Sequence, residues 1–150
     1  MTLLTPHFTF EELTDSDYAT RNGIDNRPAP DLLANLTMLA EGLERVRAVL
    51  ALPIHVSSGF RSAKLNAAIG GSKMSKHMEG LAADFTCHGF GSPGEVAREI
   101  AENYTVIGFE TLIFEGTWVH VDFAESMPKG TVLTAHFGRG VATCYTRGLA

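Results

Sequence analysis

The stretch Ser75-Lys-His-Met-Glu-Gly-Leu-Ala-Ala-Asp84 joins a polar loop to an apolar segment and carries both an imidazole and a carboxylate. Successive side chains of a β-strand point to opposite faces, so a strand over residues 81–87 would place Asp84 on one face with Ala82 and Thr86. A carboxylate between alanine and phenylalanine neighbours is costly unless a strong partner holds it, and a metal ion is one such partner. The stretch therefore predicts a strand with a functional face.

A second stretch, Trp118-Val-His-Val-Asp-Phe123, repeats the pattern. Alternation would place His120 and Asp122 on one face, as in a strand that turns one face to the core and the other to a site or solvent. If both strands join one sheet, His77, Asp84 and His120 converge. Two imidazoles and one carboxylate leave the fourth position of a tetrahedral zinc site open for water, which is typical of catalytic zinc.

Spacing alone leaves a second interpretation open. A histidine in a loop is usually solvated, and Asp84 could pair with Lys73 or Lys76 near the surface. Short motifs of this kind also match by chance. The metal site is therefore a hypothesis that needs further support from the sequence.

Composition excludes several classes of protein. The chain has 150 residues, 45% of them hydrophobic, and a net charge of −5, which argues against disorder and against a nucleic-acid partner. No window approaches the ~20 apolar residues of a membrane helix, and the N-terminus lacks the features of a signal peptide. We expect one domain over residues 1–150, monomeric, not inserted in a membrane and cytoplasmic as synthesised. Cys87 and Cys144 lack metal or redox spacing and are expected to be buried free thiols.

Hydrophobic periodicity predicts an α+β fold. Apolar residues at helical spacing predict a long amphipathic helix over residues 31–50. Capping-box patterns at Thr9 and Ser92 predict helices over residues 8–20 and 92–103. Shorter elements are expected as helical turns at 61–69 and strands at 54–58, 81–87, 111–115, 118–123, 132–137 and 141–146. This order favours a mainly antiparallel sheet with helices packed on one side.

The motifs, taken together, resemble those of the zinc D-Ala-D-Ala carboxypeptidase family. The resemblance begins at Ser57-Ser-Gly-Phe-Arg61, continues through Ser75 to Asp84 and ends at Trp118-Val-His120, within a core of about residues 54–123. The family includes phage endolysins that cut L-Ala-D-Glu bonds, and it shares a fold with the hedgehog signalling domain. The start of the chain resembles phage and prophage members in particular.

This resemblance implies a function and a ligand set. It implies a zinc-dependent peptidase that hydrolyses an amide of the peptidoglycan stem peptide, either D-Ala-D-Ala or L-Ala-D-Glu, and that reaches the cell wall after lysis or by another export route. His77, Asp84 and His120 would bind one zinc ion. Arg61 would contact the substrate and polarise the scissile carbonyl, because arginine keeps its charge and presents a fork of donors. Ser75 would hydrogen-bond a ligand or the substrate, or else stabilise its loop as an ST-turn.

The general base departs from the family pattern. Members usually carry an acidic residue three positions before the last histidine, where this chain has Thr117, which cannot exchange a proton near neutral pH. Glu115 is the nearest upstream carboxylate, and a hairpin turn or bulge after it could bring it over the metal. We therefore expect Glu115 to be the base, with Glu110 and Asp122 in reserve. Asp122 fits better as an acceptor for an imidazole N–H.

Two further observations bear on function. Residues 45–78 carry six lysines and arginines and no acidic residue, so a cationic rim could attract the carboxylates of a peptidoglycan peptide. The same residues could equally form a solvated surface. Thr117 also keeps open a second function, a zinc-containing phage module that binds peptidoglycan or is structural and has lost its activity. Turnover of peptidoglycan would separate the two functions.

Overall fold

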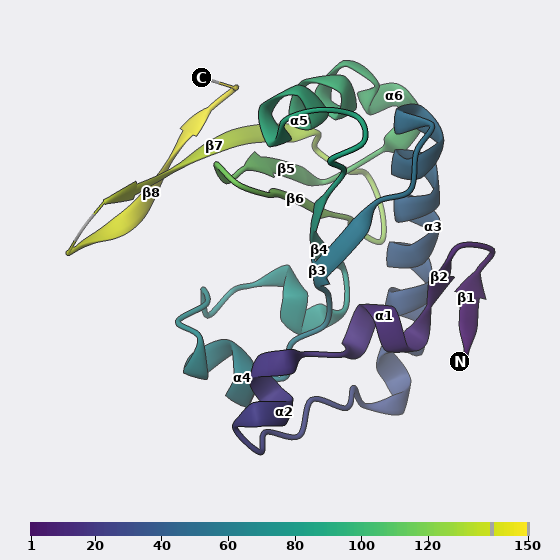
Figure 1. Ribbon diagram of the computed structural model, residues 1–150, viewed down its shortest axis with the longest axis vertical. Coiled ribbons are helices and arrows are strands. Elements are labelled where there is room, and N and C mark those ends of the chain that lie inside the picture. The colour runs from purple at the N-terminus through teal and green to yellow at the C-terminus, as the bar shows by residue number, and fades with distance from the viewer. Residues whose placement is uncertain (139, 150) are drawn as a thin grey trace.

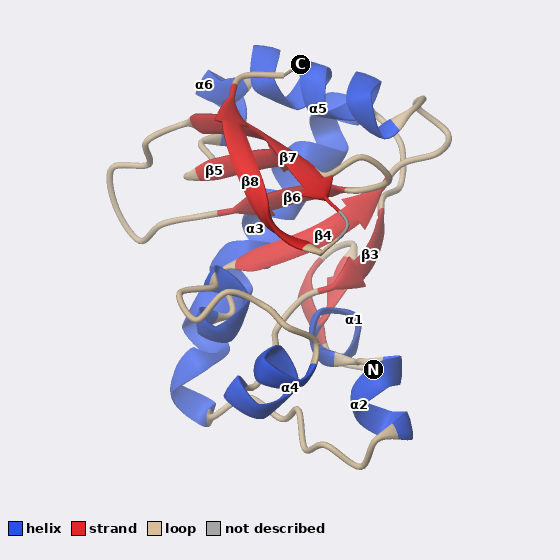
Figure 2. Cartoon of the chain, turned by 90° about the vertical axis from the view of Figure 1, so that its left-hand side faces the viewer, coloured by secondary structure: helices blue, strands red, loops and turns tan. Residues whose placement is uncertain are grey.

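The sheet of this protein has its helices on one face and its functional cleft on the other. The computed structural model describes residues 1–138 and 140–149. Within them, one sheet has the strand order β3-β4-β6-β5-β7-β8. The strands are β3 (His55–Ser58), β4 (Ala82–Thr86), β5 (Thr111–Phe114), β6 (Val119–Asp122), β7 (Thr131–Gly138) and β8 (Val141–Arg147). Helices α3 (Leu33–Leu50), α5 (Pro93–Glu102) and α6 (Tyr104–Ile107) lie on one side of the sheet, and the β7–β8 hairpin extends away from them on the other side (Figure 1, Figure 2).

The predicted α+β class is confirmed, and each of the six strands falls where alternation placed it. β4 pairs antiparallel with both β3 and β6, and β6 pairs antiparallel with β5. β7 then returns beside β5 in parallel, before β8 pairs antiparallel with β7. The sheet is therefore mixed rather than a simple meander, because the chain passes from β6 back across β5 to reach β7.

The helices follow the predicted caps with one correction. The single helix expected over residues 8–20 is two helices, α1 (Phe10–Thr14) and α2 (Asp17–Arg21). Asp15 is extended, and the Ser16 side chain accepts a hydrogen bond from the Ala19 N–H and so starts a new helix. The remaining elements are β1 (Leu3–Thr5), β2 (Phe8–Thr9), η1 (Pro30–Leu32), α3 (Leu33–Leu50), α4 (Ala63–Ala68), η2 (Lys76–Glu79), α5 (Pro93–Glu102) and α6 (Tyr104–Ile107).

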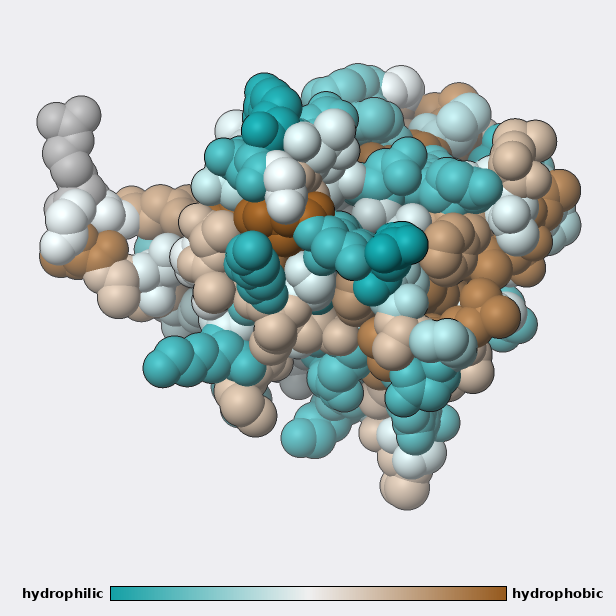
Figure 3. Space-filling model, turned by 90° about the horizontal axis from the view of Figure 1, so that it is seen from below, coloured by the Kyte–Doolittle hydropathy of each residue, from teal (hydrophilic) through white to brown (hydrophobic). Residues whose placement is uncertain are grey.

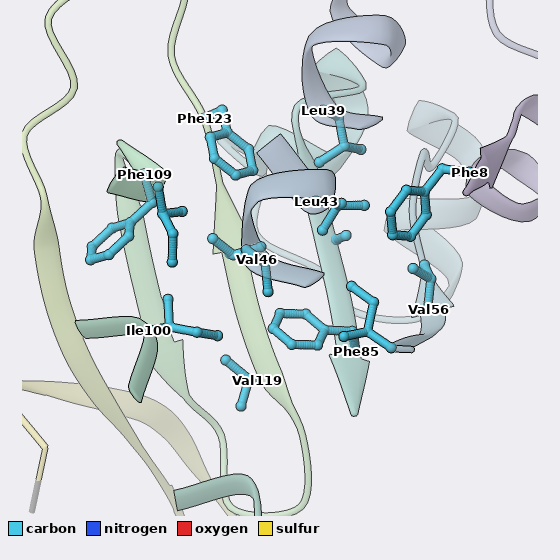
Figure 4. Packing of buried hydrophobic residues seen from close by; sticks show 14 of the residues in the cluster. Phe8, Leu39, Leu43, Val46, Val56, Phe85, Ile100, Phe109, Val119 and Phe123 are labelled. Atoms are coloured by element: carbon cyan, nitrogen blue, oxygen red, sulfur yellow. The ribbon is translucent and has the colours of Figure 1, made fainter. Parts of the chain in front are cut away.

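The core lies between α3 and the sheet. The apolar stripe of α3 buries Leu39, Leu43 and Val46 against the sheet side chains Phe85 and Val119 (Figure 4). Because strand side chains alternate, burying these residues on the helix face forces their neighbours in sequence to the opposite face. The core thus determines which side chains of β4 and β6 face the cleft.

The two cysteines differ in environment. Cys87 is buried, and its thiol donates to the Pro53 carbonyl at 3.4 Å. Cys144 is exposed on β8, so the expectation that both thiols are buried is wrong for Cys144. β8 is an edge strand whose residues are all exposed, and neither of its faces meets the core. Among the described residues, no helix combines the length and apolar character needed to cross a membrane.

Gly42 on α3 gives a test of this packing. A Cβ at Gly42 would overlap the buried ring of Phe123, which follows β6. Overpacking of this kind costs about 1–3 kcal/mol, and the better helix propensity of alanine returns about 1 kcal/mol. We therefore expect Gly42→Ala to lower the free energy of unfolding by up to about 2 kcal/mol, measured by denaturant titration.

A double-mutant cycle provides the control. In a Phe123→Leu background the smaller side chain leaves room for the added methyl group, so Gly42→Ala should be neutral or stabilising there. An equal loss in both backgrounds would contradict the proposed contact between this helix and the ring.

Candidate metal centre

Three side chains of different elements meet on the open face of the sheet. Asp84 on β4 lies directly opposite His120 on β6 in the antiparallel register, and His77 lies in η2 just before β4. The ligand atoms of all three lie within 4.8 Å of one another, and all three residues are buried. The structure therefore brings together the residues that the two sequence motifs placed on one face.

The His77 ring is oriented by its other nitrogen. Its Nδ1 lies 2.7 Å from the Gly59 carbonyl oxygen, which can only accept, so Nδ1 carries the proton. Nε2 then presents a lone pair at 3.3 Å from Asp84 Oδ1. Burial lowers the pKa of His77, which favours this neutral form. A lone pair facing a carboxylate oxygen at this distance is the arrangement that a cation between them would stabilise.

The backbone of His77 is fixed as well. Ser75 is the N-cap of η2, and its hydroxyl accepts from the His77 N–H at 3.1 Å. Gly80 ends this turn with a φ of 71°, a conformation that glycine adopts without strain. Ser75 also lines the cleft. Two roles were expected for Ser75, a contact with a ligand or substrate and the stabilisation of its loop. The hydrogen bond from the His77 N–H corresponds to the second role.

His120 lies between two carboxylates. Its Nδ1 lies 3.1 Å from Asp84 Oδ1, and its Nε2 lies 2.8 Å from Asp122 Oδ2. Burial alone would lower the pKa of His120, but the hydrogen bonds with Asp122 and Asp84 raise it to about 10. Each ring nitrogen thus faces a carboxylate oxygen, an arrangement that favours the protonated ring. A metal ion at Nδ1 would replace one proton, while Asp122 would keep accepting from Nε2–H, as expected from the sequence.

Asp84 is the negative centre of the cluster. Its Oδ1 faces both histidines, and its Oδ2 accepts from Arg61 Nη2 at 3.2 Å. Burial alone would raise the pKa of Asp84, yet the hydrogen bond from His120 and the positive charge of that ring hold it well below its usual range. Its partner is Arg61 and not a surface lysine, since Lys76 pairs with Glu79. This buried, ionised carboxylate with two imidazoles is a donor set that suits zinc.

Arg61 is anchored beside the cluster. Its Nε donates to Ser58 Oγ at 3.2 Å and its Nη1 to Asn66 Oδ1 at 3.3 Å, in addition to the ion pair with Asp84. The side chain is 14% exposed and lines the cleft. Gly59 belongs to the Ser57–Arg61 motif of the sequence, and Asn66 lies five residues beyond it. Their positioning roles were not foreseen there.

Glu115 reaches the same cleft from the turn after β5. The Trp118 indole N–H donates to Glu115 Oε2 at 2.9 Å, and Gly116 closes the turn with a φ of 85°. Burial raises the pKa of Glu115, and the negative charge of Asp84 raises it further. The position of Glu115 agrees with the expected tight turn. Of the reserve carboxylates, Asp122 is bonded to His120, and Glu110 is not among the residues that line the cleft.

The cluster lies in a cleft of about 510 Å³. One wall is the loop of residues 69–76, and the other comes from the β7–β8 hairpin. Glu115 and Trp118, from the turn between β5 and β6, also line the cleft. The hairpin residues in this wall are Phe137, Thr143 and Tyr145. Residues 124–150 carry no recognisable motif, and their pattern predicts only the strands over residues 132–137 and 141–146.

Comparison with known proteins places this geometry in context. The model of one protein family, described as peptidase M15, matches residues 6–122, which is more than half of the chain and includes His77, Asp84, Glu115 and His120. No curated protein sequence matches the chain.

The contact between Asp122 and His120 yields a prediction about metal affinity. Asp122→Asn replaces a charged acceptor with a neutral one, so the His120 ring should be a weaker ligand. We expect zinc affinity, measured by competition with a chelating dye, to fall by about 10–100-fold. Glu125→Gln removes an exposed carboxylate just beyond β6 and serves as the control, with unchanged affinity expected. Equal affinities of the two variants would show that Asp122 does not support the metal.

Proposed function

The chain belongs to the peptidase M15 family, and from this we propose that it is a zinc-dependent peptidase that hydrolyses an amide bond in the peptide of bacterial peptidoglycan. The observation that carries the proposal is the cluster of His77, Asp84 and His120 in a cleft that also contains Glu115 and Arg61. Bound there, zinc would act as a Lewis acid toward the scissile carbonyl and lower the pKa of water. The protein side chains supply the remaining chemistry.

Glu115 is the proposed general base. Its carboxylate accepts a proton from the attacking water and returns it to the leaving amine nitrogen. A carboxyl group acts efficiently as both base and acid near neutral pH only if its pKa is raised toward that pH. Burial raises the pKa of Glu115 and so shifts it toward neutral pH. The hydrogen bond from Trp118 holds one oxygen, Oε2, and leaves Oε1 to exchange the proton.

Arg61 is the proposed partner of the oxyanion. An arginine carries five N–H donors, and the contacts with Ser58, Asn66 and Asp84 use three of them. These contacts fix the guanidinium in the cleft before substrate arrives. A cation held in place beside the developing negative charge lowers the barrier without reorganisation during the reaction.

The substrate class follows from charge and family membership. Arg61 and Lys76 both line the cleft, on the side of the loop of residues 69–76. Carboxylates of a stem peptide would find complementary charge there. Which amide is cut, D-Ala-D-Ala or L-Ala-D-Glu, depends on how the peptide extends from the metal centre.

The test is amine release from purified peptidoglycan, with the zinc content measured in the same samples. The wild type should bind about one zinc per chain and release new amino groups. Full zinc occupancy without turnover would instead support the binding-module function that Thr117 left open.

Replacement of the proposed base gives a sharper prediction. Glu115→Gln keeps the shape of the side chain but cannot take a proton, so turnover should fall by about 10²–10⁴-fold with zinc content unchanged. Glu110→Gln is the matched control, because Glu110 does not line the cleft and its loss should leave turnover intact. If Glu115→Gln retains wild-type turnover, the base is another group, with Asp122 the next to test.

A further inference from the structure

The β7–β8 hairpin forms one wall of the cleft. Phe137, Thr143 and Tyr145 line the cleft together with Trp118. The hairpin lies outside residues 6–122, so the family match assigns it no role. In the views along two directions it projects beyond the body of the molecule (Figure 1, Figure 3).

The aromatic side chains of this wall present their surfaces to solvent. The rings of Trp118 and Phe137 have centroids 5.9 Å apart and an interplanar angle of 42°. Phe137 is 58% exposed and Tyr145 is 50% exposed. We call Trp118, Phe137 and Tyr145 the aromatic wall. Ligand sites are commonly lined by such aromatic surfaces with a few polar groups among them, and here Thr143 supplies a hydroxyl.

The two walls of the cleft differ in charge. The charged residues of the described lining all come from outside the hairpin, which contributes none. They are Arg61, Lys76, Asp84, Glu115 and Asp122. The cleft therefore suits a ligand with a charged part, which meets the metal centre and the loop, and an uncharged part, which meets the hairpin. In peptidoglycan, the stem peptide carries the carboxylates and the amino sugar to which it is attached is an uncharged ring.

We propose that the aromatic wall binds the flat face of the N-acetyl sugar ring that carries the stem peptide, an inference that rests on the proposed function. The rings of Trp118 and Phe137, with centroids 5.9 Å apart, form a surface about as wide as a sugar ring. An alanine methyl group, the other uncharged part of the ligand, is smaller than this surface. The hydroxyls of Thr143 and Tyr145 offer polar partners for sugar hydroxyl or acetamide groups. The wall would thus select a peptide that is still attached to its sugar.

The test compares a muramyl peptide with the same peptide lacking the sugar. Trp118 is the single tryptophan of the chain, so its fluorescence reports directly on binding at the wall. Phe137→Ala and Tyr145→Ala remove exposed side chains and should not impair folding. Cys144→Ser is the matched control, since Cys144 is exposed on β8, next in sequence to Tyr145, and is not part of the cleft lining.

We expect each wall variant to weaken binding of the muramyl peptide, and to lower its kcat/KM, by about tenfold. The sugar-free peptide should show no change with either variant, and Cys144→Ser should behave as the wild type. A loss of the same size on both ligands, or no loss on either, would overturn the proposal.

The two proposals fail separately. The protein could change its fluorescence only with the muramyl peptide, lose this change in the wall variants, and hydrolyse neither ligand. This result would support sugar binding by the aromatic wall and contradict the peptidase function. Hydrolysis of both ligands, unaffected by the wall variants, would support the peptidase function and overturn the wall.

Discussion

The buried carboxylate of Asp84 is the constraint on which the rest of the site depends. It lies in the interior of the sheet on β4, and it is ionised although burial opposes the charge. Leaving such a charge without its partner costs about 3–5 kcal/mol, so the surroundings must supply positive charge. Arg61 does so from the segment between β3 and α4, and His120 does so from β6. A metal ion would add further positive charge beside Asp84. The buried carboxylate that costs folding free energy is thus also the group that favours metal binding.

The surrounding backbone fixes which atoms face Asp84. The Gly59 carbonyl accepts a hydrogen bond from His77 Nδ1–H, and Asp122 Oδ2 accepts one from His120 Nε2–H, so the other nitrogen of each ring faces Asp84. Gly59 itself packs against the backbone carbonyl of Leu13, where a Cβ would not fit. The N-terminal helix α1 is thereby tied to the orientation of a proposed ligand. The backbone of α1 packs against Gly59, and the Gly59 carbonyl orients His77. The geometry of the site therefore depends on the N-terminal segment as well as on the sheet.

Much of this arrangement could be predicted from residue patterns, because alternation along a strand is a local property. It placed Asp84 and His120 on one face, and the pairing of β4 with β6 brings them together. The acceptor for His77 could not be predicted, since a backbone carbonyl leaves no mark in the sequence. The helix expected over residues 8–20 is interrupted because Ser16 caps a second helix. The place of the hairpin in the cleft lining could not be predicted, because it depends on how close β7 and β8 lie to residues distant in sequence. Local sequence patterns carry no information on such contacts.

Anomalous diffraction at the zinc absorption edge, from crystals of the zinc-loaded chain, would locate the metal. We expect a single strong peak between Asp84, His77 Nε2 and His120 Nδ1, about 2.0–2.1 Å from each nitrogen. A peak elsewhere, or coordination of His120 through Nε2, would rule out the metal site described above. Either result would mean that the hydrogen bonds that the two histidines donate to Gly59 and Asp122 do not orient the ligands of a metal.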